Sequence, residues 1–237
     1  MIDDQILDAA PADLTLRDRA QSMIRDAILD GHFRPGQKLV ERELSELTGV
    51  SRSVLRECLS HLEARGLIQR QSYRGFSVAL LSEDSVREIY ELRLPIEALA
   101  AELFTARATQ TQIKALQGAM TDLEESMTSF DVRRIRQVKE QYYNILFSSC
   151  GNMEIRRALE NVIDRIYYLR GQTMQDPARR AESLDEMRRL TDSLVSRNKD
   201  DARAASLAHI GAARDAIMER VETSSARYNV KSGQGSC

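Results

Sequence analysis

The sequence has few of the features that secreted, membrane-spanning or disulfide-stabilised proteins depend on. Its three cysteines, Cys58, Cys150 and Cys237, are far apart and odd in number, which disfavours a disulfide framework and indicates a reducing compartment. No apolar run approaches the ~20 residues that a membrane-spanning helix needs. The acidic N-terminus lacks the basic start and apolar core of a signal peptide. We therefore expect a cytoplasmic protein with no membrane partner.

Catalytic motifs are missing as well. The sequence has no Gly-rich phosphate loop, no His-Glu-x-x-His, no Gly-x-Ser-x-Gly and no paired-cysteine metal motif. The many acidic side chains are scattered at the spacing of solvated helix faces. These absences predict that the protein is not an enzyme and needs no cofactor.

Charge is unevenly spread along the chain. The whole sequence carries a net charge of −2, but residues 14–81 hold eleven Lys and Arg against eight Asp and Glu. This segment is therefore at +3 and the remainder at −5. A basic N-terminal third in an acidic protein is the charge pattern of a nucleic-acid site joined to a second, different domain.

Two short helices joined by a tight turn are predicted between Leu39 and Leu67. Gly49 permits the left-handed backbone of the turn, and Ser51 is placed to cap the second helix. The buried stripe of that helix consists of Val54, Leu55, Cys58, Leu59 and Leu62. An amphipathic helix precedes this pair, and two extended runs, 67–70 and 76–80, follow it with a hairpin loop at 72–75. Three helices followed by a β-hairpin form a winged helix-turn-helix.

From Ser82 onward the pattern is helical. Cap and stop signals predict helices over residues 82–106, 109–127, 131–149, 152–172, 176–197 and 201–221. Pro95 should bend the first of these helices or interrupt it. We expect a mainly α fold in which a winged helix-turn-helix precedes an all-α bundle of six to seven helices. The predicted domains are a flexible leader (1–13), a DNA-binding domain (14–81), a helical domain for ligand sensing and dimerisation (82–222) and a disordered tail (223–237).

Polar and basic side chains gather at the start of the predicted DNA-reading helix. Arg52 and Arg56 are four residues apart and share a helix face, from which a guanidinium can donate two hydrogen bonds to guanine. Hydroxyls and helix N-terminal amides suit phosphate oxygens, and a glycine at the wing tip lets the backbone approach the minor groove. The alternative is a solvated helix face, but the turn, the apolar register and the wing together favour DNA. The candidate DNA-binding residues are Arg42, Ser51, Arg52, Ser53, Arg56, Arg74 and Gly75.

These motifs resemble those of the GntR family of transcriptional regulators. The segment GHFRPGQKLVERELSELTGVSRSVLRECLSHLEARGLIQR and the later RGFSV contain the family's Pro-Gly turn, its Glu-Arg-x-Leu helix and its Val-Ser-Arg-x-x-Leu-Arg-Glu signature. The resemblance implies that Arg42, Ser51, Arg52, Ser53, Arg56 and Gly75 contact double-stranded operator DNA. It also implies a homodimer acting on a near-palindromic site.

The rest of the chain is similar to the helical effector domain of the FadR-like branch, known as FCD. The resemblance rests on ELRLPIE at 91–97, on Tyr142-Tyr143 through Gly151-Asn152, and on Glu186-Met187 through His209. Many members of the branch bind a divalent metal through one Asp and three His. The corresponding positions here hold Lys139, Tyr143, Met187 and His209, and an ammonium, a phenol and a thioether are poor ligands for such a metal. The resemblance therefore predicts no metal.

A metal in relatives would hold a carboxylate effector, and Lys139 can supply the positive charge in its place. The candidate ligand-binding residues are Arg93, Lys139, Tyr143, Met187 and His209. In the alternative, Lys139 extends to solvent and Tyr143 is ordinary packing. The sequence thus predicts a ligand-responsive transcriptional regulator, more specifically a repressor, whose small-molecule effector is an organic acid. The alternative function is a non-specific or ligand-independent DNA-binding protein whose helical domain serves only dimerisation.

Overall fold

The computed structural model describes residues 15–71, 75–128, 131–160 and 162–233, the last ten without their side chains. The predicted leader and residues 234–237 lie outside this range. The chain divides into two compact units. The first contains residues 1–80 together with 161–171, and the second contains 81–160 and 172–237. The sequence assigns 161–171 to the helical domain, whereas the structure clusters this segment with the winged helix.

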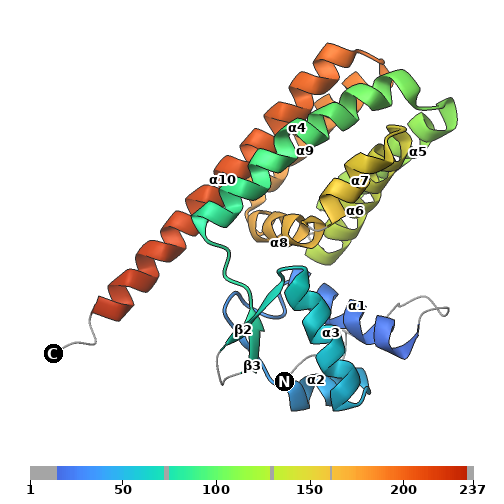
Figure 1. Cartoon of the computed structure of the whole chain (residues 1–237). Coiled ribbons are helices and arrows are strands. Elements are labelled where there is room, and N and C mark those ends of the chain that lie inside the picture. Colours follow the sequence, from blue (N-terminus) through green and yellow to red (C-terminus); the bar gives the residue numbers. More distant parts are fainter. Residues whose placement is uncertain (1–14, 72–74, 129–130, 161, 234–237) are drawn as a thin grey trace. The chain divides into compact units, whose positions relative to one another are not determined.

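Three helices and a small sheet form the N-terminal part of the first unit (Figure 1). Their bounds are α1 (Leu16–Leu29), β1 (Lys38–Leu39), α2 (Glu41–Thr48), α3 (Arg52–Ala64), β2 (Ile68–Gln71) and β3 (Gly75–Val78). The strands are antiparallel in the order β1-β3-β2, with Leu39 opposite Phe76 and Ile68 opposite Val78. The sequence predicts β2 and β3 as a hairpin but not β1. A two-residue strand has no periodicity to detect, and only its pairing with β3 defines it.

The core of the winged helix is apolar and closed. Ile24 and Ile28 of α1 are fully buried, as are Leu55 and Leu59 of α3. This is the register that the sequence predicts, and it leaves the N-terminal polar residues of α3 on the opposite face. Gly49 ends α2 at φ 69°, in the left-handed region where a side chain would be strained.

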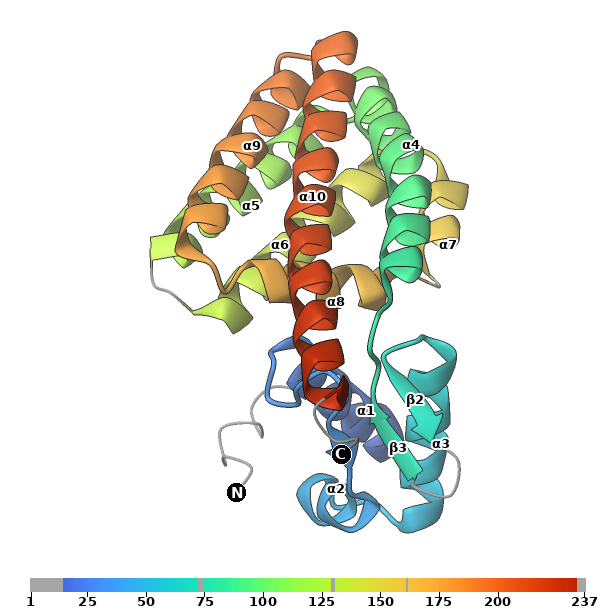
Figure 2. The same cartoon turned by 90° about the vertical axis from the view of Figure 1, so that its left-hand side faces the viewer.

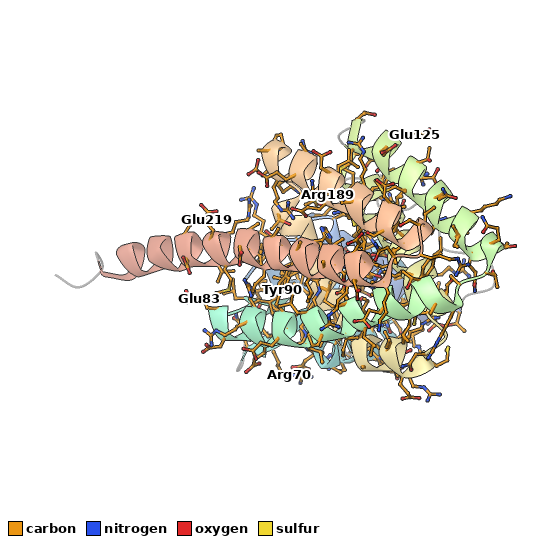
Figure 3. All side chains as sticks on the ribbon, turned by 90° about the horizontal axis from the view of Figure 1, so that it is seen from above. Arg70, Glu83, Tyr90, Glu125, Arg189 and Glu219 are labelled. Carbon is orange, nitrogen blue, oxygen red and sulfur yellow. The ribbon has the colours of Figure 1, made fainter. Side chains whose placement is uncertain are left out.

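Seven further helices follow in the described residues, and they range from eight residues in α7 to 35 in α10. Their bounds are α4 (Glu83–Arg107), α5 (Gln110–Thr128), α6 (Val132–Ser149), α7 (Met153–Glu160), α8 (Ile163–Thr173), α9 (Pro177–Val195) and α10 (Lys199–Gly233). In the second unit α10 packs between α4 and α9, and α5 packs on α6 and α9 (Figure 2). Charged side chains such as Glu125, Arg189 and Glu219 point outward from these helices, whereas Tyr90 is buried (Figure 3). Mainly helical architecture with a small wing is what the sequence predicts.

The cap signals in the sequence locate the helix starts. Ser82, Asp131 and Asp176 each accept a hydrogen bond from a backbone N–H in the first turn, and Thr109 forms a capping box with Gln112. Each cap satisfies a backbone donor that has no intrahelical acceptor. Capping chemistry is local, so it is readable without the fold.

Two predictions about helix continuity differ from the structure, and a third is decided only in part. The helix predicted over 152–172 is two helices, α7 and α8. The apolar periodicity of α8 continues that of α7, so the sequence does not show the break. Helix α8 packs with the first unit instead. Of the two effects predicted for Pro95, a bend or an interruption, the interruption is absent, since α4 continues from Glu83 to Arg107. The tail after 222 is predicted to be disordered, which is wrong for 223–233, since α10 continues to Gly233. That segment is polar but holds no proline and no glycine before Gly233, so nothing in it stops a helix.

Arg197, in the turn between α9 and α10, forms hydrogen bonds with the end of α4. Its backbone is in the left-handed region at φ 58°, and its guanidinium donates to the carbonyl oxygens of Thr105 at 2.8 Å and Ala108 at 2.6 Å. These carbonyls belong to the last turn of α4, where intrahelical donors are missing.

We expect Arg197→Ala to lower the free energy of unfolding by about 1–3 kcal/mol, because the C-terminal carbonyls of α4 lose a charged donor. Arg197→Gly loses the same donor but relieves the left-handed backbone, so it should be about 1 kcal/mol more stable than Arg197→Ala. Urea unfolding followed by circular dichroism measures both. Equal stability of the two variants would contradict the strained turn.

Candidate functional site

The N-terminal end of α3 presents hydroxyls and backbone donors to solvent. Ser51 is the N-cap, and its Oγ accepts from the Val54 backbone N–H at 3.5 Å. The Oγ atoms of Ser51 and Ser53 are 3.0 Å apart, and both side chains are exposed. A phosphate placed here meets two hydroxyls and the positive end of the helix dipole.

Arg52, Arg56 and Arg42 surround this helix end and are all exposed. In the part of the chain that the structure describes, Arg52 has no ion-pair partner. Arg56 Nε lies 3.0 Å from Glu41 Oε2 with a side chain 69% exposed, and Arg42 Nε lies 4.0 Å from Glu46 Oε1. Exposed pairs of this kind contribute ~1 kcal/mol or less. Arg56 and Arg42 can therefore exchange these carboxylates for a base edge or a phosphate at little cost.

The wing contributes a further basic side chain that sequence reasoning missed. Gly75 starts β3 at φ 82° and is exposed. Arg74 lies outside the described residues. Arg70 of β2 stacks over the ring of Phe76 at 4.8 Å and remains 61% exposed, with Glu63 at 3.5 Å. The signal for Arg70 was its cross-strand position opposite an aromatic residue, which depends on the strand register.

The five predicted ligand-binding residues are all buried in the helical unit. Lys139 is 4% exposed, so its ammonium does not extend to solvent as the alternative supposed. Lys139 Nζ donates to Ser183 Oγ at 2.7 Å and lies 3.6 Å from Met174 Sδ. Tyr143 OH lies 3.8 Å from Met187 Sδ. Helices α6 and α9 thus bring Lys139, Tyr143 and Met187 to one internal surface.

Arg93 of α4 is fully buried with an incompletely used guanidinium. Its Nε donates to Glu97 Oε1 at 2.7 Å, and its Cζ lies 4.5 Å from the centre of the Tyr90 ring. Among the described residues, neither Nη1 nor Nη2 has a hydrogen-bond partner. Burial favours loss of the charge, but the carboxylate of Glu97 outweighs it and the pKa of Arg93 is raised. A permanent cation with two unused donors is a site for a bidentate anion.

His209 belongs to a charged chain that crosses from α10 to α9. Its Nδ1 lies 2.6 Å from Glu186 Oε2, and Arg179 donates to both oxygens of Glu186 at 2.7 and 2.8 Å. Burial of Glu186 opposes its charge, but the hydrogen bonds from His209 and Arg179 prevail and lower its pKa to about 2. Sequence reasoning named His209 but not Arg179 or Ser183. Their spacing with Met187 on one face of α9 was the available signal.

These side chains do not fit a metal ion. Where the family resemblance would place metal ligands, the chain carries an ammonium at Lys139, a phenol at Tyr143 and a thioether at Met187. An ammonium has no lone pair, and the single imidazole already faces a carboxylate. Among the described residues, no three His, Cys, Asp or Glu side chains are grouped as a metal site requires.

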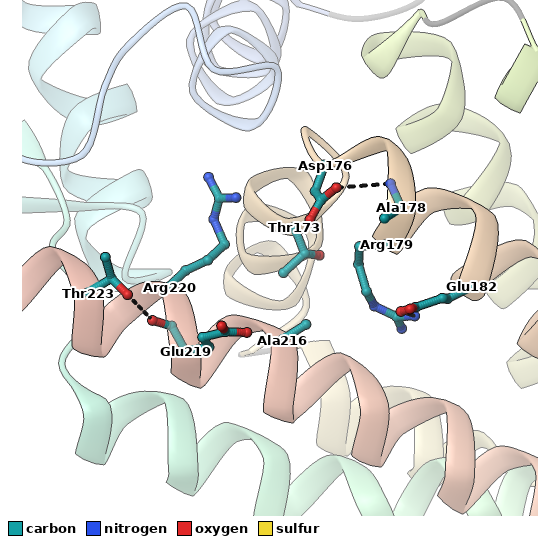
Figure 4. A pocket seen from close by; sticks show the side chains of 9 residues that line it. All are labelled: Thr173, Asp176, Ala178, Arg179, Glu182, Ala216, Glu219, Arg220 and Thr223. Carbon is teal, nitrogen blue, oxygen red and sulfur yellow. Dashed lines mark hydrogen bonds and ion pairs between the residues drawn. The ribbon is translucent and has the colours of Figure 1, made fainter.

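A polar pocket of about 500 Å³ lies beside this core within the helical unit. Its lining comes from the α8–α9 turn, the first turns of α9 and the α10 helix (Figure 4), and consists of Thr173, Asp176, Ala178, Arg179, Glu182, Ala216, Glu219, Arg220 and Thr223. Arg179 lines the pocket and also pairs with Glu186. Arg179 therefore connects the pocket to the buried Glu186 and His209.

We expect Glu186→Gln to lower the free energy of unfolding at neutral pH by about 2–3 kcal/mol, because the folded state holds this carboxyl at a pKa of about 2 against an ordinary 4.5. A lowered folded-state pKa stabilises the protein above pH 4.5, and the contribution disappears as the pH falls from 4.5 to about 2. The difference in free energy of unfolding between the native protein and Glu186→Gln should therefore become smaller as the pH falls through that range. Urea unfolding at pH 6 and pH 3 measures it.

Glu182→Gln is the matched control, since this carboxylate also faces Arg179 but at 3.5 Å and with a side chain 68% exposed. It should change stability little at either pH. If the loss of stability in Glu186→Gln did not depend on pH, the proposed ion pairing of Glu186 with Arg179 and His209 would be contradicted.

Comparison with known proteins finds a matching family model for each of the two predicted domains. The model of the bacterial regulatory proteins of the gntR family matches residues 16–78, and the FCD domain model matches residues 88–212. An uncharacterized HTH-type transcriptional regulator of Bacillus subtilis, YdhC, is 30% identical over 189 residues, covering 79% of this chain and 84% of that protein. The Nta operon transcriptional regulator of Aminobacter aminovorans is 30% identical over 188 residues, covering 79% of this chain and 88% of its own.

The fold has a solved counterpart. The crystal structure of a GntR regulator from Rhodococcus sp. RHA1 superposes with a TM-score of 0.76 at 21% identity, covering 86% of this chain and 97% of that one. Within the residues that the structure describes, no helix combines the length and apolar character needed to cross a bilayer. The chain belongs to the GntR family of bacterial transcriptional regulators, DNA-binding proteins rather than enzymes, in which an FCD domain binds a small-molecule effector.

Proposed function

We propose that this protein is a metal-free repressor whose operator affinity is controlled by a small carboxylate. In this proposal residues 14–81 bind operator DNA in the cytoplasm, and residues 82–222 dimerise and hold the effector. Two winged helices in a homodimer then meet the two halves of a near-palindromic site.

The proposed DNA contacts divide by chemistry. Arg52 and Arg56, one helical turn apart on exposed α3, enter the major groove and donate to guanine edges. Ser51, Ser53 and Arg42 bind phosphate oxygens and set the register of the helix on the duplex. Arg74 and Gly75 of the wing contact the backbone or the minor groove. Support for this division comes from the exposure of Arg52, Ser51 and Ser53 and from the weak, exposed pairs of Arg56 and Arg42.

The proposed effector is a carboxylate because of Arg93. A buried guanidinium whose Nη1 and Nη2 lack hydrogen-bond partners is costly in a packed helical core unless an anion or water completes it. Tyr143 contributes to the raised pKa of Arg93, after the larger effects of burial, Glu97 and Tyr90, and Lys139 is one turn before Tyr143 on α6. A carboxylate between these groups receives a two-pronged hydrogen bond and a second positive charge. The observation that carries the proposal is that Nη1 and Nη2 of the buried Arg93 have no hydrogen-bond partner among the described residues.

Met187 and His209 complete the proposed site. Met187 supplies an adaptable apolar wall next to Tyr143. His209 is held by Glu186, whose other contact, Arg179, lines the polar pocket. An anion that enters through the pocket meets Arg179 first, and its carboxylate then competes with Glu186 for the same cations.

We expect the dimer to bind an operator, selected from a pool of random duplexes, at least tens of times more tightly than random DNA. Arg52→Ala should remove about 1–3 kcal/mol of that preference, because a base contact is lost, while random-duplex affinity changes much less. Fluorescence anisotropy at one fixed salt concentration measures both constants. Arg87→Ala, an exposed arginine on α4 paired with Asp84, is the matched control and should leave both unchanged.

We expect mono-, di- or tricarboxylates to bind with measurable heat, and the corresponding primary amides not to bind. Lys139→Met should weaken carboxylate binding tenfold or more, because the charge is lost from a buried site. Lys114→Met, at an exposed lysine of α5, is the control and should bind as the native protein does. Excess EDTA should leave the affinity unchanged.

Equal carboxylate affinity in Lys139→Met and the native protein would overturn the direct ion pair. Loss of binding in EDTA, restored by a divalent metal, would overturn the metal-free site. Operator binding that no carboxylate alters would favour the alternative, in which the helical domain only dimerises. The existing bond from Lys139 Nζ to Ser183 Oγ is the observation that favours that alternative.

A further inference from the structure

Helix α8 lies within the sequence matched by the FCD domain but packs with the DNA-binding unit. The FCD match covers residues 88–212, whereas residues 161–171 cluster with residues 1–80. The winged helix of this protein therefore has a fourth helix, supplied by the effector domain.

A buried carboxylate on α8 joins two helices of the winged helix. Asp164 is 1% exposed, and its Oδ1 accepts a hydrogen bond from Arg25 Nε of α1 at 2.7 Å. Its Oδ2 lies 2.5 Å from Nε of Arg65, the residue that ends α3. Burying an unpaired carboxylate costs several kcal/mol. Loss of either arginine would therefore leave this buried carboxylate with only one cationic partner of the two.

Helix α8 also lies very close to the backbone of the winged helix at other points. A Cβ atom on Gly66 would stand 2.8 Å from Arg165 Cδ, and a Cβ atom on Gly171 would stand 2.9 Å from the Leu29 carbonyl oxygen. Tyr168 OH donates to the Ala79 carbonyl oxygen at 3.4 Å. Helix α8 thus contacts the end of α1, the end of α3 and the exit from the wing.

We propose that Asp164 is a positioning residue for operator recognition: its carboxylate holds the C-terminal end of α3, through Arg65, in the orientation that operator binding requires. The inference rests on the proposed role of α3 in reading DNA. Arg52 and Arg56 lie at the opposite end of a single rigid helix from Arg65, so a tilt at the anchored end displaces them in the groove.

The end of α8 leads directly to the proposed effector site. Three residues after Gly171 the chain reaches Met174, whose Sδ lies 3.6 Å from Lys139 Nζ and whose carbonyl accepts from Arg180 Nη1 at 2.8 Å. A carboxylate that draws Lys139 toward itself changes the contact with Met174. The chain connection then transmits the change to α8 and to Asp164. An effector regulates only if the two states differ in such contacts.

The test compares Asp164→Asn, Arg65→Gln and the double variant with the native dimer, using the selected operator and a random duplex. Arg65 is 38% exposed, so Arg65→Gln serves as the milder variant if Asp164→Asn folds poorly. We expect each single variant to lose operator affinity tenfold or more, with random-duplex affinity kept within twofold. The double variant should be no weaker than the weaker single variant, because both remove the same ion pair.

Asp185→Asn is the control, since this exposed carboxylate pairs with Arg188 on the bundle surface and should leave both affinities unchanged. A merely structural role for Asp164 would lower the melting temperature and leave the operator-to-random ratio unchanged, which would overturn the inference. Additive losses in the double variant would also overturn it. A native protein without operator preference would instead refute the proposed function itself.

Discussion

A charged group buried among helices needs a close polar partner, most often an opposite charge, and this requirement organises the interior of the protein. Removing a carboxylate or guanidinium from water costs several kcal/mol unless a close, hydrogen-bonded partner offsets the loss. Arg93 meets this requirement with Glu97, and Glu186 meets it with Arg179 and His209. Asp164 meets it with Arg25 and Arg65. The Glu186 and Asp164 pairs join different helices, at positions that hydrophobic packing alone would leave less specifically placed.

The arginines at the start of α3 obey the opposite rule. Arg52 and Arg56 are exposed, and the ion pair of Arg56 with Glu41, like that of Arg42 on α2 with Glu46, is weak because water screens it. Weak pairing leaves a guanidinium available for a polyanion, whereas strong pairing fixes it within the fold. The same residue type is thus weakly paired at the exposed Arg56 and paired with a buried carboxylate at Arg65, and burial of the opposing carboxylate makes the difference.

The side chains of Lys139, Tyr143 and Met187 give the interior of the helical domain a different electrostatic character from that of a metal centre. A divalent metal concentrates two positive charges at one point and requires lone-pair donors around it. Here positive charge is distributed over Arg93, Lys139 and Arg179, each held by a neighbouring oxygen. The proposed carboxylate would bind this distributed charge without a metal, and each cation would leave or share an existing partner to bind it.

The sequence by itself determined the elements whose signals are local. The apolar stripe at Leu55 and Leu59, the left-handed Gly49 and the caps at Ser51, Ser82 and Asp176 each depend on neighbours within a turn of helix, so the pattern alone predicts them. The fold class and the exposed face of α3 follow from the same periodicities. The helix at 223–233 was missed because polarity was taken for disorder, although no residue there stops a helix.

Only the tertiary structure decided which separated residues meet. The strand β1 exists because Lys38 and Leu39 pair with β3, and the break between α7 and α8 exists because α8 packs on the winged helix. The direction of Lys139 was ambiguous in the sequence, since a boundary lysine can bury its ammonium or extend it to water. Asp164 carries no motif at all. Its role arises from Arg25 and Arg65, about a hundred or more residues away in the chain, and such contacts depend on packing rather than on any pattern of neighbours.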